Sequence, residues 1–407
     1  MDCPRNFVRP LKGNTLVVNK VKRMQKVTLL LTLVAIHSAF FTACTTQNPT
    51  LDSVVEQFAE QIKRDVEEDN VGSISFGIYH EGKTVYSDAF GVMDRKTSRP
   101  AQPQHIYRTG SISKSITAVL MMLLVQDGLV RLDDPVSKFL PEIGGIQNFQ
   151  GQTPAITLQQ LATHTSGLIR EPEMEGAASG PIDTWEDKIL SSIPHTYFQA
   201  NPGDEYSYSN IGYGILGLAL SRAVEVPFMN LVEERIFHPL EMTSTTFIVD
   251  QTLSDRLASG YVYTQGINQQ RVIDGSTPLQ EHSGRGYKVP NGGVYSTAAD
   301  LAKLAELMSG SQPQLLAPKL LETMMSIQTP ESDTDGYGLG FSLSLNKEGL
   351  WWVSHGGSVA GYNAYLLFQP DSRLSIVLLR NYSGGMTNLG AIAREVGDEL
   401  LGLLSTP

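Results

Sequence analysis

Between residues 51 and 89 of this 407-residue chain, the spacing of apolar and polar residues changes from a helical to a strand-like period. Residues 51–70 repeat apolar positions every three or four residues, which is the spacing of an amphipathic helix. The apolar positions are Val54, Val55, Phe58, Ile62 and Val66. Residues 74–79 and 84–89 then alternate with a period of two around the polar turn at 80–83, which predicts a β-hairpin.

The C-terminal part of the chain returns to strand-like patterns. Short apolar or alternating runs occupy 340–345, 350–354, 364–368 and 374–379, and a helical pattern covers 389–403. Strands therefore lie at both ends of this region.

The long middle region, 111–330, shows helical periodicity broken by Pro and Gly. We therefore expect an α/β (α+β) fold in which one antiparallel sheet is built from both chain ends and flanked by helices. A mostly helical lobe, 110–335, would be inserted between the two parts of a sheet lobe, 51–109 and 336–407.

The N-terminal segment has the features of an export signal. Basic residues precede the apolar run 27–41, whose fifteen residues are too few for a transmembrane helix of about 20. They fit the apolar part of a signal peptide, so we predict that residues 1–43 are a signal peptide and that 44–50 form a polar tether. Met24 is an alternative start, because it leaves a more compact basic segment.

The end of this signal resembles a bacterial lipobox. Thr42 and Ala43 precede Cys44, although Phe41 stands where Leu is usual. The resemblance implies that lipid on Cys44 holds the mature protein on a membrane, and the absence of an acidic residue after Cys44 implies the outer membrane, facing the periplasm. Ordinary cleavage near Ala43, with an incidental cysteine, is the alternative.

The charge, cysteine and histidine content argue against a nucleic-acid partner, a structural disulfide and a metal site. The chain carries 31 Lys and Arg against 42 Asp and Glu, and much of the basic charge lies in the signal segment, so nucleic acid is not expected as a partner. The two cysteines, Cys3 and Cys44, leave no pair for a structural disulfide after cleavage. The eight scattered histidines show no spacing typical of a zinc site, so we expect no metal or cofactor.

Ser111 and Lys114 provide the first candidate chemistry. They lie three residues apart, nearly one helical turn, and therefore share one helix face ahead of the apolar run 116–125. A hydroxyl beside an amine in a dry environment makes a nucleophile with its base. Taken alone, however, a Ser at a helix start is usually a cap and a Lys one turn later is usually solvated.

Two further motifs follow in order. Tyr208-Ser209-Asn210 begins 97 residues after Ser111, and His355-Gly356-Gly357-Ser358 begins 147 residues after Tyr208. With the flanking phrases 107–111, 156–168 and 292–301, this ordered set resembles the serine β-lactamase and penicillin-recognising superfamily. It is most similar to the class C-like branch, which includes esterases, D-amino-acid peptidases and DD-carboxypeptidases. The resemblance covers nearly all of 51–407, which would form a single catalytic domain with a β-lactamase/DD-peptidase-like fold.

The resemblance implies a role for each motif residue. Ser111 would attack an acyl carbonyl and carry the acyl group, and either Lys114 or Tyr208 would take its proton. Nearby cations would lower the pKa of the Tyr208 phenol. Asn210 would orient the amide of the substrate.

The third motif would complete an oxyanion hole. The backbone N–H groups of Ser111 and Ser358 would bind the oxyanion, and Gly356 and Gly357 would allow the backbone to approach the substrate. His355 departs from the Lys that opens this motif in many β-lactamases and penicillin-binding proteins. An imidazole is mostly neutral at pH 7, so a site for a substrate carboxylate would be weakened and efficient β-lactam hydrolysis is put in doubt.

The sequence therefore predicts an exported serine hydrolase that forms an acyl-enzyme on Ser111. Its substrate would be a small ester or a D-amino-acid peptide or amide. The alternatives are a β-lactamase, or a penicillin-binding sensor with little turnover. His164, in the phrase 156–168, is expected to be structural and to lie outside the site.

Overall fold

The computed structural model describes residues 50–404, except for 149, 266–270 and 330–331. The predicted signal peptide 1–43, the lipid site Cys44 and the tether up to Pro49 lie outside the described residues.

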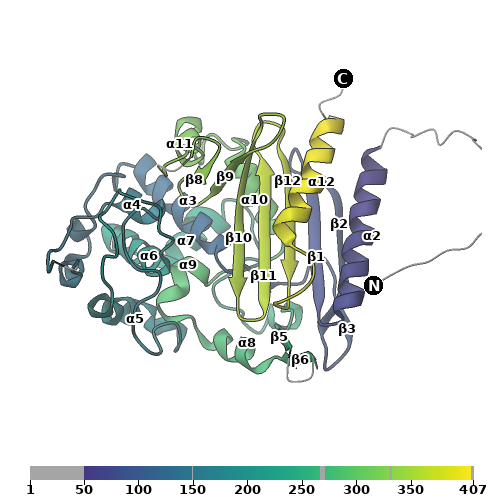
Figure 1. Cartoon of the computed structure of the whole chain (residues 1–407), viewed down its shortest axis with the longest axis horizontal. Coiled ribbons are helices and arrows are strands. Elements are labelled where there is room, and N and C mark those ends of the chain that lie inside the picture. Colours follow the sequence, from purple (N-terminus) through teal and green to yellow (C-terminus); the bar gives the residue numbers. More distant parts are fainter. Residues whose placement is uncertain (1–49, 149, 266–270, 330–331, 405–407) are drawn as a thin grey trace, which may run out of the picture. The chain divides into compact units, whose positions relative to one another are not determined.

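The central feature is an eight-stranded antiparallel sheet in the order β3-β2-β1-β12-β11-β10-β9-β8 (Figure 1). The strands are β1 (Ser73–His80), β2 (Lys83–Asp94), β3 (Arg99–Pro100), β8 (Asp335–Tyr337), β9 (Ser342–Leu345), β10 (Trp351–Val359), β11 (Tyr362–Gln369) and β12 (Leu374–Arg380). β1 pairs with β12 from Ile74 opposite Arg380 to His80 opposite Leu374. The two chain ends thus meet in the middle of the sheet, which confirms the fold predicted from the sequence.

Two helices from opposite ends of the chain cover one face of the sheet, α2 (Leu51–Asp69) and α12 (Leu389–Leu404). The apolar positions that predicted α2 are all buried, in a core shared with strands β1 and β12. Thr50 and Ser53 form a reciprocal capping box that fixes where α2 begins.

The other face carries α3 (Ile112–Gln126) and α10 (Ala298–Met308), which both contact strands of the sheet. Every residue of α3 from Ile112 to Leu124 is buried, because the sheet lies on one side of it and helices lie on the other. α10 comes from the range predicted as helical lobe, yet it packs on β1, β11 and β12. The lobes therefore interleave more than a simple division of the sequence suggests.

Most of the remaining elements form the helical region beyond α3 (Figure 1). They include α4 (Leu158–Ala162), α5 (Trp185–Ser192), α6 (Asn210–Val224), α7 (Phe228–Val232) and α9 (Val289–Gly292). Two further short helices, α8 (Ser276–Gln280) and α11 (Pro318–Met324), lie outside this region. Two short ladders, β4 (Tyr107–Arg108) with β7 (Tyr295–Ser296) and β5 (Val262–Gln265) with β6 (Arg271–Asp274), were not predicted. Over the described ranges, no single helix is long and apolar enough to cross a membrane; α6 and the helical segment 228–237 pass only together, across an 82° bend.

Candidate active site

Ser111 lies at the N-terminus of α3, where its hydroxyl is not used to cap the helix. The first turn is closed instead by N–H groups of Ile112, Ser113 and Lys114, which donate to the carbonyls of the residues three before them. The Ser113 hydroxyl donates to the Gly110 carbonyl at 2.8 Å. The interpretation of Ser111 as an ordinary cap is therefore wrong, and its hydroxyl is available for chemistry.

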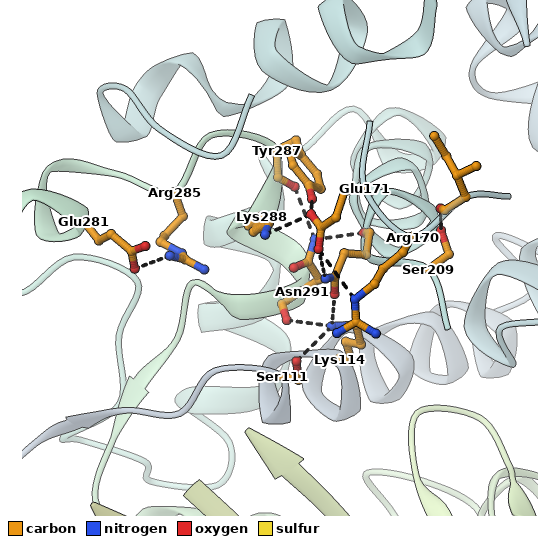
Figure 2. A network of polar contacts seen from close by, with 12 residues as sticks. Ser111, Lys114, Arg170, Glu171, Ser209, Glu281, Arg285, Tyr287, Lys288 and Asn291 are labelled. Carbon is orange, nitrogen blue, oxygen red and sulfur yellow. Dashed lines mark hydrogen bonds and ion pairs between the residues drawn. The ribbon is translucent and has the colours of Figure 1, made fainter. Parts of the chain in front are cut away.

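Lys114 is completely buried one turn along the same helix, so the solvated interpretation is also wrong. Its Nζ lies 3.2 Å from Ser111 Oγ, 2.8 Å from Asn210 Oδ1 and 3.1 Å from the carbonyl oxygen of Asn291 (Figure 2). Burial holds the pKa of Lys114 well below its usual range, and the charges of Lys288 and Arg170 lower it further.

The hydrogen-bond geometry around Lys114 suits a neutral amine. A neutral amine has two N–H groups and one lone pair. Asn210 Oδ1 and the Asn291 carbonyl can only accept hydrogen bonds, so they take both N–H groups. The lone pair is then left for the hydroxyl proton of Ser111, which is the arrangement that a general base requires.

Tyr208 is the third member of this group, immediately before the N-cap residue of α6, Ser209. Its ring centroid lies 4.8 Å from Lys114 Nζ, and Tyr208 lines the same pocket as Ser111. The sequence predicted a lowered phenol pKa, but burial raises the pKa of Tyr208 by more than the Ser111 hydrogen bond and the Arg170 charge lower it. That prediction was wrong because loss of hydration outweighs the nearby cation.

The sequence suggested that Asn210 would orient the amide of the substrate. In the structure, its side-chain amide instead bonds to other residues of the protein. Its Oδ1 accepts from Lys114, and its Nδ2 donates to Glu171 Oε1 at 2.5 Å. The side chain is buried with both polar ends used inside the protein. Asn210 therefore positions Lys114 in this structure.

Glu171 anchors this arrangement and was missed from the sequence (Figure 2). Besides Asn210 Nδ2, its carboxylate accepts from the Tyr287 hydroxyl and from Lys288 Nζ at 2.9 Å. Because Glu171 accepts from Nδ2, the Oδ1 of Asn210 must face Lys114. The only signal in the sequence was a charged pair, Arg170-Glu171, which follows the phrase 156–168 after one residue.

The backbone segments before α3 and within β10 approach one another closely. A Cβ on Gly357 would lie 1.9 Å from the Thr109 carbonyl oxygen, and one on Gly110 would lie 2.7 Å from the Ser358 nitrogen. Only glycine fits at both positions, and this contact brings the backbone nitrogens of Ser111 and Ser358 to the same pocket. Gly356 has ordinary contacts only, since a Cβ there would lie 3.5 Å from Tyr365.

His355 opens the third motif but its side chain does not line the pocket. It is buried, with Nδ1 at 2.7 Å from the Gly356 carbonyl and Nε2 at 2.9 Å from the Tyr337 hydroxyl. A carbonyl can only accept, so Nδ1 carries the proton and Nε2 accepts from Tyr337. Burial lowers the pKa of His355 to about 3, so the ring is neutral, and His355 is not among the residues that line the pocket. The imidazole therefore offers no positive charge to a substrate carboxylate.

His164, which was expected to be structural, packs directly against the site residue Tyr208. Its ring centroid lies 4.1 Å from that of Tyr208, and its Nδ1 accepts the backbone N–H of Ser209 at 3.0 Å. It is completely buried. His164 therefore fixes the position of Tyr208 rather than reacting itself.

The three motifs open into one pocket of about 580 Å³. Ser111, Tyr208 and Arg170 line it together with the 356–358 strand segment and the segment 385–390, which enters α12. A larger cavity of about 1070 Å³ lies beside the β2–β3 connection and contains none of the motif residues. The chemistry therefore identifies the smaller pocket as the candidate active site.

Comparisons with known proteins show which family and fold the chain shares. The chain is 28% identical to "Beta-lactamase-like protein 2" of Dictyostelium discoideum over 330 residues, which cover 79% of this chain and 58% of that protein. It is 25% identical to "Protein flp" of Staphylococcus aureus (strain N315), over 80% of this chain and 63% of that protein. The chain thus spans about three fifths of the length of these curated relatives.

Solved structures show the same fold. A penicillin-binding protein homologue from Pyrococcus abyssi, described as octameric, superposes with a TM-score of 0.71 at 26% identity, over 86% of this chain and 77% of the other. EstCE1, described as a hydrolase with promiscuous acyltransferase activity, gives a TM-score of 0.72 at 19% identity, over 86% and 99%. The Beta-lactamase family model matches residues 52–399. The protein therefore belongs to the Beta-lactamase family.

Proposed function

We propose that this protein is a serine hydrolase that cleaves a small ester or a D-amino-acid peptide or amide through an acyl-enzyme on Ser111. The observation that carries the proposal is the position of Lys114 Nζ, 3.2 Å from Ser111 Oγ with both of its N–H groups directed to fixed acceptors. This geometry prepares the amine to receive one proton from one hydroxyl.

The reaction would proceed in two halves. Ser111 Oγ attacks the substrate carbonyl carbon while its proton passes to Lys114, and the N–H groups of Ser111 and Ser358 stabilise the oxyanion. Collapse of the intermediate expels an alcohol or amine, which takes up the proton. Water then attacks the acyl carbon, releases the acid and restores the Ser111 hydroxyl.

The two candidate bases are distinguished by the directions of their pKa shifts. The shift of Lys114 moves it toward the neutral form that can accept a proton. The shift of Tyr208 moves it away from phenolate. Lys114 is therefore the better base at neutral pH, and Tyr208 is better suited to relay a proton to the leaving group.

Penicillin binding with slow turnover is the second candidate, favoured by the structural likeness to the penicillin-binding protein homologue at 26% identity. The neutral, buried imidazole of His355 argues against efficient β-lactam hydrolysis. A panel of p-nitrophenyl esters, D-alanyl-D-alanine peptides and nitrocefin separates these functions. We expect ester or peptide turnover to exceed nitrocefin turnover, and the reverse order would favour a β-lactamase.

The pH dependence of acylation should change when Lys288 is replaced. Acylation needs neutral Lys114, so its rate rises as pH rises through the Lys114 pKa. The positive charge of Lys288 lowers the pKa of Lys114, whereas the negative charge of Glu171 raises it. Lys288 also forms an ion pair with Glu171 and so offsets the charge of that carboxylate. Lys288→Gln should therefore raise the Lys114 pKa and move the acid limb of kcat/KM to higher pH.

The control for this experiment is Lys319→Gln, an exposed lysine of α11 with the same change of charge. Its profile should match the wild type. An acid limb that stays in place or moves to lower pH in Lys288→Gln would show that Lys114 does not titrate in acylation.

We further propose that the protein is exported and anchored by lipid on Cys44, facing the periplasm from the outer membrane. The basic segment, the fifteen-residue apolar run and Thr42-Ala43-Cys44 support this. Cys44→Ser should release soluble protein or leave it uncleaved. Wild-type protein found in the soluble periplasmic fraction with an unmodified N-terminus by mass spectrometry would contradict lipidation.

A further inference from the structure

Arg170 is an exposed cation at the mouth of the active-site pocket. Its side chain is 65% exposed and lines the same pocket as Ser111 and Tyr208. Figure 2 shows the side chain extending toward Ser111 and Lys114. The guanidinium lies 4.8 Å from the ring centroid of Tyr208, so it rests on an aromatic face while its donors remain accessible.

The backbone of Arg170 is held in place although its side chain is exposed. Its carbonyl accepts the N–H of Asn210 at 2.8 Å and that of Ile211 at 3.3 Å, at the start of α6. The backbone of Arg170 is therefore fixed by the same helix that carries Asn210, and the guanidinium rests on the Tyr208 ring.

The charge of Arg170 is only weakly neutralised. Its ion pair with Glu171 is long, 3.9 Å from Nε to Oε1. The same carboxylate is bonded at closer range by Asn210, Tyr287 and Lys288. Arg170 thus retains donors for a further anion.

The other basic side chains of the third motif and the pocket, His355 and Arg380, are hydrogen-bonded within the protein rather than available to a substrate anion. His355 is buried and hydrogen-bonded on both nitrogens. Arg380, at the other end of the pocket, is buried and donates to the carbonyls of Tyr382 and Thr387 and to Asn363 Oδ1. The Arg380 guanidinium therefore stabilises the wall of the pocket through these hydrogen bonds.

We infer that Arg170 is a specificity-determining residue that binds a carboxylate of the substrate during acylation of Ser111. This rests on the proposed hydrolase function and names the substrate class: esters or amides that carry a free carboxylate. The positive charge absent from the third motif is supplied from the segment between α4 and α5. A planar guanidinium matches a carboxylate with two parallel N–H bonds.

A matched pair of substrates tests this directly. Meta-acetoxybenzoate and meta-acetoxybenzamide differ by a carboxylate against a carboxamide of similar size. We expect the ratio of their kcat/KM values, acid over amide, to fall about tenfold in Arg170→Gln, given the strength of charge-assisted hydrogen bonds at a partly exposed site. Arg170→Lys should retain most of the ratio, and Arg170→Glu should lower it further.

The ratio separates recognition from other effects of the substitution. If Arg170 acted only by holding Tyr208 or by tuning Lys114, both substrates would slow equally and the ratio would stay constant. Added NaCl should lower the ratio in the wild type but not in Arg170→Gln, because salt screens an exposed charge. Arg64→Gln, an exposed arginine of α2, is the matched control and should leave the ratio unchanged. A ratio in Arg170→Gln within twofold of the wild type overturns the inference.

A binding measurement keeps this inference independent of the proposed reaction. In a Ser111→Ala background, the affinity for meta-acetoxybenzoate measured by calorimetry should fall about tenfold on adding Arg170→Gln, while the affinity for the amide is retained. If the wild type hydrolyses neither these esters nor any ester or peptide of the panel above, the proposed function fails, and the affinities still decide the role of Arg170. Equal affinities of the two backgrounds for the acid would refute it.

Discussion

Replacing Ser111 by alanine is expected to abolish turnover of every substrate that the wild type hydrolyses. No other hydroxyl among the residues lining the pocket lies within hydrogen-bond distance of Lys114 Nζ in the described part of the chain. The fold should be retained, because the Ser111 side chain does not cap α3 and the helix turn is closed by other groups. Steady-state kinetics and a thermal melt of the purified variant provide both measurements.

The matched control is Ser191→Ala, an exposed serine of α5 whose hydroxyl donates only to the carbonyl one turn earlier. It should be as active as the wild type. Residual esterase activity in Ser111→Ala that is well above background, with an intact fold, would mean that another group carries the acyl chain.

Replacing Lys114 should be nearly as severe, with a loss of at least about 10³-fold in kcat, because the base that takes the Ser111 proton is removed. Lys114→Met is the better variant for kinetics, since it keeps most of the buried volume. It still leaves Asn210 Oδ1 and the Asn291 carbonyl without their donor, so the melting temperature should also fall.

Tyr208→Phe provides the comparison that interprets this loss. If Lys114 is the base, Tyr208→Phe should slow acylation less than Lys114→Met does. Single-turnover acylation rates separate this step from deacylation. Rates close to the wild type in the Lys114 variant would refute the mechanism.

Much of the fold could be predicted because its signals are local. The heptad-like spacing of Val54 to Val66 marks α2, and the alternation on both sides of 80–83 marks the β1–β2 hairpin. A single antiparallel sheet built from both chain ends followed from placing strands at both ends, but the pairing of β1 with β12 was not predicted. The ladders β4–β7 and β5–β6 carry only two to four residues per strand, which is too short for periodicity to show.

The site residues that could be predicted are likewise those with a local sequence signal, and those that depend on distant contacts could not be predicted. Ser111 and Lys114 were recognisable because their spacing is fixed by one helix turn. Glu171 and Asn291 reach Asn210 and Lys114 from distant parts of the chain, so no spacing reveals them. The direction of the His355 ring depends on Tyr337, a residue of another strand, and could not be predicted from the motif alone.

The most direct test of the account is to trap the acyl-enzyme. Wild-type protein mixed with p-nitrophenyl acetate, quenched in acid within the first turnover and digested, should show one acetyl group on the peptide that contains Ser111. The release of p-nitrophenol should begin with a burst of about one equivalent per active chain. An acetyl group on another residue, or steady hydrolysis with no burst and no acetylated peptide under single-turnover conditions, would contradict the claim that Ser111 is the nucleophile.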